Sequence, residues 1–418
     1  MTNSTRSVAA RVLGRVRFRS PLRGPWLTSV FGAVLLACLP LVVITGLLDY
    51  VAYGRGQSIP GDVGWLHLPI FDWPARPSWL FRLTQGLHVG LGLVLVPVVL
   101  AKLWSVIPKL FAWPPARSLA QALERISLLL LVGSILFEIA TGVLNIQYDY
   151  VFGFSFYTGH YLGAWVFIAA FVTHVSLKLP TMVRALRSRS LRKELATPLE
   201  ATEPEPRDEN GLVAEDPAPP TLSRRGLLGV VGGGVLLVGV LTAGQTIGGP
   251  LRDLAFLLPR GREPGEGGNR YPVNRTAAAA GVTGQATGAP WRLKVNGAKE
   301  FTRDELLALP QHTARLPIAC VEGWSTVQTW TGVRLRDLAA LAGVPDPGSA
   351  FVASLERGPF ARATLNPGQV THPDALLALR VNGEDLSLDH GFPARVIVPA
   401  LPGVHCTKWV RSIDFRSV

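Results

Sequence analysis

The sequence is poor in charged residues. Only 17% of its 418 residues are Asp, Glu, Lys or Arg, whereas 48% are hydrophobic and the mean hydropathy is +0.29. Soluble globular proteins carry about 25% charged residues, so this composition argues against a wholly soluble protein. The chain holds 43 Gly and 33 Pro, yet its hydrophobic fraction is too high for an intrinsically disordered protein.

Cysteine is scarce as well. Three cysteines in 418 residues exclude a scaffold held together by disulfides. The net charge is +12, but the basic residues gather beside apolar runs and form no stripe interleaved with aromatic residues. This distribution is typical of a membrane protein and argues against a nucleic-acid partner.

Five apolar segments are long enough to cross a bilayer of about 30 Å. They lie at 26–48, 84–107, 124–146, 158–179 and 226–247. Arginines precede the first segment, Lys and Arg follow the fourth, and Arg224 and Arg225 precede the fifth, whereas the loop at 147–157 contains neither. By the positive-inside rule the N-terminus lies in the cytoplasm and, after five crossings, the C-terminal domain lies outside it.

Four parts are expected along the chain. Residues 1–180 form an all-α, four-helix membrane domain, and residues 181–222 form a cytoplasmic disordered linker that turns from basic to acidic and then to proline. Residues 223–250 contain the fifth, anchoring helix, and residues 251–418 form a globular domain. The fold class is therefore multidomain, with a transmembrane helical bundle followed by an α+β domain.

Local patterns support the globular domain. Residues 291–295 alternate and end at Asn296-Gly297, which predicts a hairpin. An amphipathic helix is predicted at 333–342, and strands are predicted at 395–399 and 409–415.

Three histidines lie inside the apolar segments, where ionisable residues are functional candidates. His88 belongs to the second segment, and His160 and His174 belong to the fourth. Fourteen residues are close to four helical turns, so His160 and His174 share one helix face about 21 Å apart. Neutral imidazole is a natural axial ligand of haem iron. We expect His88 and His160 to hold one haem b near the outer face.

A second haem at His174 lacks an obvious partner. The residue at matching depth is Lys102, an unusual haem ligand that more often snorkels near a helix end. His88 could instead pair with His174 across a tilted helix, and without haem the histidines would bond neighbouring helices. The sequence therefore predicts one haem b or two. Glu138, in the third segment, is a candidate proton relay to a membrane quinone or a carboxyl bonded to a neighbouring helix.

In the globular domain, the run Leu316-Pro-Ile-Ala-Cys320-Val-Glu-Gly-Trp-Ser325 ends an apolar strand in a single cysteine. Such a cysteine is a small core residue, a nucleophile or a soft-metal ligand, and spacing alone leaves this open. Cys406 could approach Cys320 in the fold, and a disulfide between them would forbid metal binding.

The same run, followed by Trp330-Thr-Gly-Val, resembles the molybdenum-ligand segment of the sulfite oxidase-like molybdopterin proteins. Two later runs, 378–399 and 403–413, also resemble that family, in the same order. The resemblance covers roughly 270–418. The turn at 321–325 is more similar to the bacterial branch that includes the periplasmic methionine sulfoxide reductase catalytic subunit than to the true sulfite oxidases.

The resemblance implies an α+β fold that binds molybdopterin. It makes Cys320 the catalytic residue and the metal ligand, bound to molybdenum as a thiolate. It implies that His390, Arg395 and Lys408 hold the phosphate and the ring of the pterin. The affinity of Arg and Lys for phosphate agrees with this role. The run Asn269-Arg-Tyr-Pro-Val-Asn-Arg-Thr276 is similar to the family's entry segment, so Asn274 and Arg275 are weaker candidates for cofactor contacts.

The run Ser223-Arg-Arg-Gly-Leu-Leu-Gly229 resembles a twin-arginine export signal placed inside the chain. A domain loaded with its cofactor in the cytoplasm must cross the membrane folded, and such a signal permits this. The alternative is that both arginines only obey the positive-inside rule. No clear cleavage site follows, so the span is expected to remain as an anchor.

The sequence thus predicts a bacterial multi-pass oxidoreductase of the cell membrane. Oxygen-atom transfer at molybdenum, on a small oxidised or reduced substrate, would be coupled through haem b to a membrane quinone. One alternative is a haem-b electron-transfer protein whose C-terminal domain keeps the molybdopterin fold without catalysis and docks a partner. The other is a quinone-linked cytochrome with a purely structural exterior domain.

Overall fold

The computed structural model of the protein describes residues 18–54, 71–110, 118–145, 154, 156–207, 211–255, 257, 266–358 and 360–417. Within these residues, five helical segments are long and apolar enough to cross a membrane, which confirms the expected number. They are α2 (Pro25–Tyr53), α3 (Leu80–Val94) continued by α4 (Val96–Leu110), α5 (Leu119–Asn145), α6 (Phe156–Ser188) and α8 (Arg224–Ile247).

The second segment is interrupted at Leu95, between α3 and α4. Pro97 follows the interruption, and a proline has no amide hydrogen to donate to the preceding helical turn. The sequence thus explains why the two helices are assigned separately although they form one apolar run.

The chain divides into two compact units. We call residues 1–41, 91–140 and 163–239 the helical unit, and residues 42–90, 141–162 and 240–418 the mixed unit. The division cuts several of the long helices, so that each unit holds parts of α2, α5, α6 and α8.

In the helical unit, the first part of the segment 181–222, which we expect to be a disordered linker, is helical. Helix α6 continues to Ser188, and α7 (Leu191–Ala196) follows. Glu205 is buried and accepts hydrogen bonds from the amides of Trp26 (2.8 Å) and Leu27 (3.2 Å) at the start of α2. An acidic side chain satisfies the unpaired amides of a helix N-terminus, which composition alone does not reveal.

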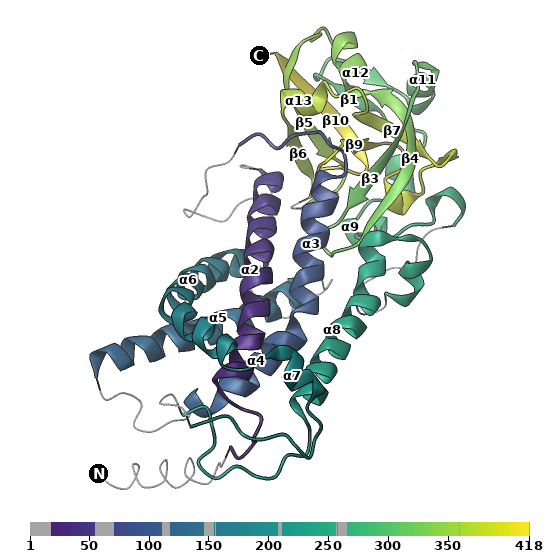
Figure 1. The fold of residues 1–418 in the computed structure, drawn as a ribbon. Coiled ribbons are helices and arrows are strands. Elements are labelled where there is room, and N and C mark those ends of the chain that lie inside the picture. The colour runs from purple at the N-terminus through teal and green to yellow at the C-terminus, as the bar shows by residue number, and fades with distance from the viewer. Residues whose placement is uncertain are drawn as a thin grey trace, which may run out of the picture. The chain divides into compact units, whose positions relative to one another are not determined.

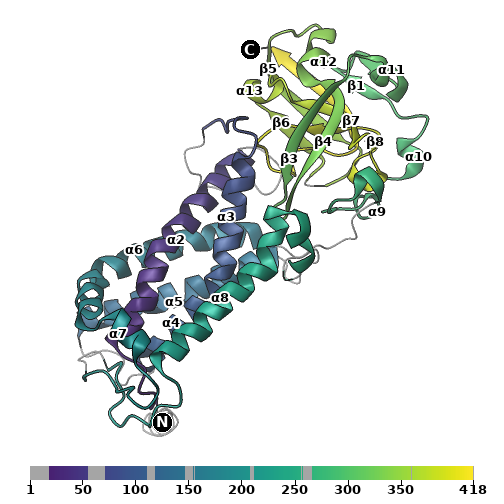
Figure 2. The ribbon, with the colours of Figure 1, turned by 45° about the vertical axis from the view of Figure 1, so that its right-hand side comes forward.

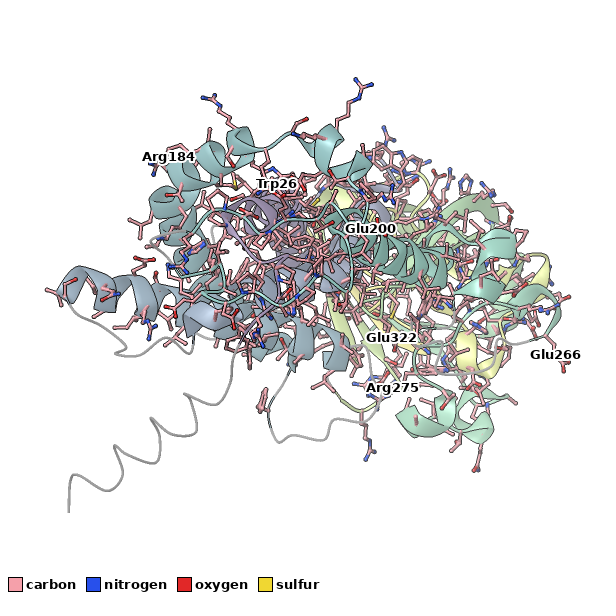
Figure 3. All side chains as sticks on the ribbon, turned by 60° about the horizontal axis from the view of Figure 1, so that its bottom comes forward. Trp26, Arg184, Glu200, Glu266, Arg275 and Glu322 are labelled. Carbon is pink, nitrogen blue, oxygen red and sulfur yellow. The ribbon has the colours of Figure 1, made fainter. Side chains whose placement is uncertain are left out.

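A second anchor of this segment is Arg224. Its buried guanidinium pairs with Glu194 (3.2 Å), and Glu194 also pairs with Arg189 (2.8 Å). In Figure 3, Trp26 lies among packed side chains, whereas Arg184 lies at the exposed edge of α6. Within its described residues, this segment thus contains helical turns and buried polar contacts, which its composition does not predict.

The mixed unit contains an α+β domain built on two five-stranded sheets (Figure 1). One sheet has the order β2-β1-β10-β5-β6, and the other has the order β3-β4-β7-β8 with β9 on β7. The strands are β1 (Leu293–Val295), β2 (Lys299–Phe301), β3 (His312–Ala319), β4 (Ser325–Arg334), β5 (Pro347–Ser354), β6 (Arg362–Leu365), β7 (Leu376–Val381), β8 (Glu384–Asp385), β9 (Arg395–Ile397) and β10 (Val410–Ser417). The short helices are α9 (Ala277–Ala280), α10 (Gly284–Thr287), α11 (Arg303–Ala308), α12 (Leu335–Leu341) and α13 (Pro367–Val370), and three 3-10 turns lie at Gly249–Leu254, Gly267–Asn269 and Leu388–His390.

The predicted local elements are confirmed. Strands β1 and β2 form the expected hairpin. Three residues join them, and the first two, Asn296 (φ 51°) and Gly297 (φ 64°), take positive φ angles. Helix α12 and strands β9 and β10 lie where periodicity places them. Figure 2 shows β3 and β4 as a long hairpin. Residues 320–324 form the turn that joins the two strands.

Candidate functional site

Cys320 directly follows strand β3 and begins a tight turn. Its amide donates to the carbonyl of Trp324 (2.9 Å), and the amide of Gly323 donates to the carbonyl of Cys320 (3.0 Å). Gly323 has a φ of 89°, which favours glycine over any residue with a Cβ. The indole of Trp324 donates to the Glu322 carboxylate (2.8 Å). These bonds fix the position of the buried sulfur.

A cavity in the α+β domain brings together residues that are far apart in the sequence. Five of its lining residues are predicted site residues, namely Asn274, Cys320, His390, Arg395 and Lys408. Arg275 is not among the lining residues. Its guanidinium pairs with the buried Glu356 (3.1 Å), and its carbonyl accepts a hydrogen bond from Lys408. Arg275 therefore contacts Lys408, a residue of the cavity wall, without lining the cavity itself.

Arg395 is buried at the wall of this cavity. Its two terminal nitrogens donate to the carbonyls of His390 and Cys406, both at 3.1 Å. Its Nε is buried and has no hydrogen-bond partner among the described residues. A buried guanidinium with an unused donor favours an additional acceptor, such as an oxygen of a bound cofactor.

His390 is held on both sides of its ring. Nδ1 lies 2.8 Å from the Ser387 hydroxyl, Nε2 lies 3.1 Å from the Tyr271 carbonyl, and the Tyr271 ring centre is 3.9 Å away. Burial, with a smaller effect of the nearby Arg395, lowers the pKa of His390 to about 4. The imidazole is therefore neutral at pH 7.

Lys408 supplies the second cation of the cavity. It donates to the carbonyls of Arg275 and Asp389, the latter at 3.0 Å. Burial lowers the pKa of Lys408 to about 7, and Arg395 adds to the effect. An anion in the cavity would offset this cost, because opposite charge favours the protonated amine.

The Cys320 thiol is wholly buried. Burial raises its pKa, and the neighbouring Glu322 raises it further. Such a group is a poor nucleophile by itself, but a bound metal ion deprotonates a coordinating thiol. The site therefore suits a soft-metal ligand better than a reactive cysteine. Within the described residues all three cysteines are free, so Cys320 and Cys406 form no disulfide.

Two residues of this site were not predicted. Tyr271 belongs to the entry run, yet only the tilted contact of its ring with His390 reveals its place. Glu356 follows β5 in an ordinary Glu-Arg-Gly sequence, and only its burial against Arg275 marks it. No sequence signal distinguishes this glutamate from an exposed one.

In the mixed unit, the rings of His88 and His160 lie next to each other in a T-shaped, edge-to-face arrangement, with centres 6.0 Å apart and planes at 85°. We call these two residues the histidine pair. One metal ion bonded to a nitrogen of each ring at about 2.0 Å separates the ring centres by about 6 Å. Nδ1 of His88 lies 2.9 Å from the Val42 carbonyl, and Nδ1 of His160 lies 3.0 Å from the Thr141 hydroxyl. Such bonds orient imidazoles whose Nε2 binds a metal.

Glycines make room for these rings. A Cβ on Gly46 would lie 2.6 Å from Cε1 of His88, and a Cβ on Gly142 would lie 3.4 Å from Cε1 of His160. The first distance is shorter than any normal contact, so Gly46 is required for the observed ring position. The two imidazoles, each held at Nδ1, are therefore candidate metal ligands.

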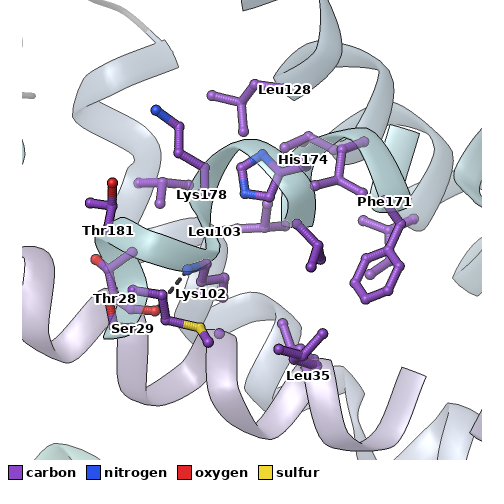
Figure 4. A pocket seen from close by; sticks show the side chains of 18 of the residues that line it. Thr28, Ser29, Leu35, Lys102, Leu103, Leu128, Phe171, His174, Lys178 and Thr181 are labelled. Carbon is purple, nitrogen blue, oxygen red and sulfur yellow. Dashed lines mark hydrogen bonds between the residues drawn. The ribbon is translucent and has the colours of Figure 1, made fainter. Parts of the chain in front are cut away.

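His174 lies in the helical unit, in a different environment. It lines an apolar cavity with Lys102 and Lys178, which we call the lysine cavity (Figure 4). Among the described residues that line this cavity, His174 is the only histidine. Lys102 donates to the carbonyl of Thr28 (2.7 Å). Glu138, the candidate relay, packs against Gly163 of α6 in the same unit.

Comparison with known proteins supports the α+β domain. Residues 280–418 match the family model described as oxidoreductase molybdopterin binding domain. The chain is 33% identical over 130 residues to the uncharacterized oxidoreductase YuiH of Bacillus subtilis (strain 168), which covers 30% of this chain and 65% of that protein.

Two further relatives are similar over shorter shares of their length. A sulfite oxidase of Arabidopsis thaliana is 39% identical over 101 residues, or 20% of this chain and 25% of that protein. A putative protein-methionine-sulfoxide reductase subunit, YedZ1, of Azospira oryzae (strain ATCC BAA-33 / DSM 13638 / PS) is 30% identical over 129 residues, or 30% and 48%. The matched part thus spans less than two thirds of each of these relatives. The expected molybdopterin-binding oxidoreductase domain is confirmed.

Proposed function

Because residues 280–418 form a molybdopterin-binding oxidoreductase domain, we propose that the chain is a membrane-bound enzyme that transfers an oxygen atom to or from a small substrate. It exchanges electrons with the quinone pool through haem b. The observation that carries this proposal is the cavity that joins Cys320 to Arg395, Lys408, His390 and Asn274.

Cys320 is the residue that would bind molybdenum. A thiolate is a soft ligand, and its burial at the fixed end of β3 leaves little freedom to the sulfur. Since burial raises the pKa of the thiol, metal binding must release its proton. When bound, molybdopterin supplies a centre that accepts or donates an oxygen atom and two electrons.

Arg395 and Lys408 would hold the anionic part of the cofactor. Arg395 has one buried donor to spare, and burial lowers the pKa of Lys408 to about 7. A phosphate raises that pKa again and accepts hydrogen bonds from both side chains. Neutral His390, fixed by Ser387 and Tyr271, would orient the ring system without adding charge.

For the membrane part, we assign one haem b to the histidine pair. The lysine cavity lacks a second imidazole among its described lining residues, so we assign it to the quinone and not to a second haem. His174 and Lys102 both offer polar nitrogen atoms in a wall that is otherwise mostly apolar. A quinone presents an apolar ring and tail with two oxygens that accept hydrogen bonds, which this wall suits.

The proposed orientation places the N-terminus in the cytoplasm of a bacterial cell and the α+β domain outside it, after twin-arginine export. The buried contact of Arg224 with Glu194 supports an order of events. A signal at residues 223–229 is readable only before the helical unit has folded around Arg224.

Elemental mass spectrometry of the detergent-purified protein tests the proposal. From a host that makes and loads the cofactor, we expect molybdenum and iron each near one atom per chain. Cys320→Ser should abolish turnover while haem reduction by a quinol persists. Iron without molybdenum, or turnover that survives the substitution, would instead indicate a cytochrome with a non-catalytic exterior domain.

A further inference from the structure

The turn that follows Cys320 is held by side chains from two of the long apolar helices. Within the mixed unit, Gln85 of α3 donates its side-chain amide to the Val321 carbonyl (3.0 Å). Thr246 of α8 donates its hydroxyl to the Gly323 carbonyl (3.0 Å). Within the turn, the amides of Cys320 and Gly323 donate to the carbonyls of Trp324 and Cys320, while the carbonyls of Val321 and Gly323 accept from the two helices.

Arg82 completes this contact. Its Nε donates to the Ser325 hydroxyl (3.0 Å), and its Nη2 donates to the carbonyls of Thr246 (2.7 Å) and Ile247 (3.1 Å). The arginine thus caps the C-terminal end of α8, where a positive charge is favoured, and ties that end to Ser325. The turn is therefore built to rest on α3 and α8.

Gln85 occupies a distinctive place among these contacts. It lies three residues before His88 on α3, so the two side chains are neighbours on one helix face. Val321 is covalently bonded to Cys320. A single hydrogen bond, from Gln85 to Val321, therefore separates the peptide that carries the cysteine from the helical turn that carries a proposed haem ligand.

From this connection we infer that Gln85 is a positioning residue for electron transfer between the two cofactors. The inference rests on the proposed function. When bound, the two cofactors would exchange single electrons, two for each oxygen atom transferred. Gln85 would hold the Val321 carbonyl, and with it the peptide next to Cys320, in a fixed place relative to the helical turn of His88. No proton needs to cross the contact, because neither the amide of Gln85 nor the carbonyl of Val321 titrates.

The chain offers a matched control. Trp73 donates its indole N–H to the carbonyl of Ala400 (2.7 Å), also within the mixed unit. Both Gln85→Met and Trp73→Phe remove one side-chain donor from one backbone carbonyl. The Val321 carbonyl belongs to the turn after Cys320, whereas the Ala400 carbonyl lies outside it.

The experiment uses detergent-purified protein that contains both metals. The haem is reduced by one electron with a flash-activated photoreductant, without substrate, and its absorbance is followed as the electron leaves. We expect Gln85→Met to slow this relaxation about tenfold or more, since small displacements of reacting groups have effects of that size. Trp73→Phe should stay within about twofold of the unaltered protein, and the haem potential should be the same in all three.

A conservative variant distinguishes loss of the hydrogen bond from misfolding of the protein. Gln85→Glu keeps the size of the side chain and can donate only when its carboxyl is protonated. Its relaxation should be slow at high pH and recover as the pH falls. Unaltered relaxation in Gln85→Met, or equal slowing in Trp73→Phe, overturns the inference. Lack of molybdenum, or lack of any relaxation in the unaltered protein, would instead contradict the proposed function.

Discussion

The two histidines of α6 share one helix and differ in everything around them. His160 lies beside a second imidazole, with ring centres 6.0 Å apart, and its Nδ1 lies 3.0 Å from a threonine hydroxyl. His174, fourteen residues later, lines a cavity with Lys102 and has no second histidine among the described residues there. The residue type is the same, so the elements packed against it decide which chemistry it can serve.

The histidine pair and the lysine cavity also differ in the charge that their side chains can carry. Two neutral imidazoles can bind a metal and bring no charge into an apolar setting, which is favourable inside a membrane. An ammonium group there must be hydrogen-bonded or paired, and Lys102 bonds to the Thr28 carbonyl. The histidine pair therefore suits a metal, whereas the lysine cavity suits a ligand with oxygen acceptors.

Removing one member of the histidine pair should have the largest effect. We expect His160→Leu to abolish haem binding, because the iron loses an axial ligand and the haem pocket loses its anchor. The measurement is the pyridine haemochrome spectrum together with iron per chain. His174→Leu is the matched control on the same helix and should keep its iron. If His174→Leu loses half of the iron, the lysine cavity holds a second haem.

A smaller effect should follow from filling the space beside His88. A Cβ at residue 46 would lie 2.6 Å from the ring, so Gly46→Ala must displace it. Overpacking costs about 1–3 kcal/mol, which weakens haem binding about 5-fold to 150-fold. Gly142→Ala places its Cβ at 3.4 Å from His160 and should cost far less. Haem retention during dilution series of both variants gives the comparison; equal retention would show that the glycines do not shape the site.

The sequence predicted that His88 and His160 lie close together, because counting residues from the start of each apolar segment gives the depth of each histidine in the membrane. It also predicted the Cys320 turn, because three segments of one domain occur in order. It did not reveal Glu205 at the start of α2, nor Gln85 on the Val321 carbonyl. Each contact joins an ordinary polar side chain to a backbone group, 179 positions away for Glu205 and 236 positions away for Gln85. Nothing in the local sequence pattern marks either partner.

His174 itself provides the next test. In the proposed assignment it contacts the quinone, so His174→Leu should slow quinol-driven haem reduction about tenfold, the typical scale for one hydrogen bond to a bound ligand. Haem content and reduction by dithionite should be unchanged. Stopped-flow absorbance with a soluble quinol measures both rates. An unchanged rate of quinol-driven haem reduction would show that the quinone does not bind in the lysine cavity. His174 would then have no assigned function.

Lys102→Met should have the smallest effect. Methionine fills a similar space, and loss of the ammonium group also removes the cost of burying a charge, so the helices should stay folded. A quinol that loses one hydrogen bond binds about threefold to tenfold less tightly. We therefore expect a higher KM for the quinol with kcat nearly unchanged. Lys178→Met is the comparison within the same cavity. Because Lys178 pairs with Glu124 (2.6 Å), we expect its loss to raise the KM less. A fall in kcat at constant KM in Lys102→Met would mean that the ammonium group acts on electron transfer and not on binding.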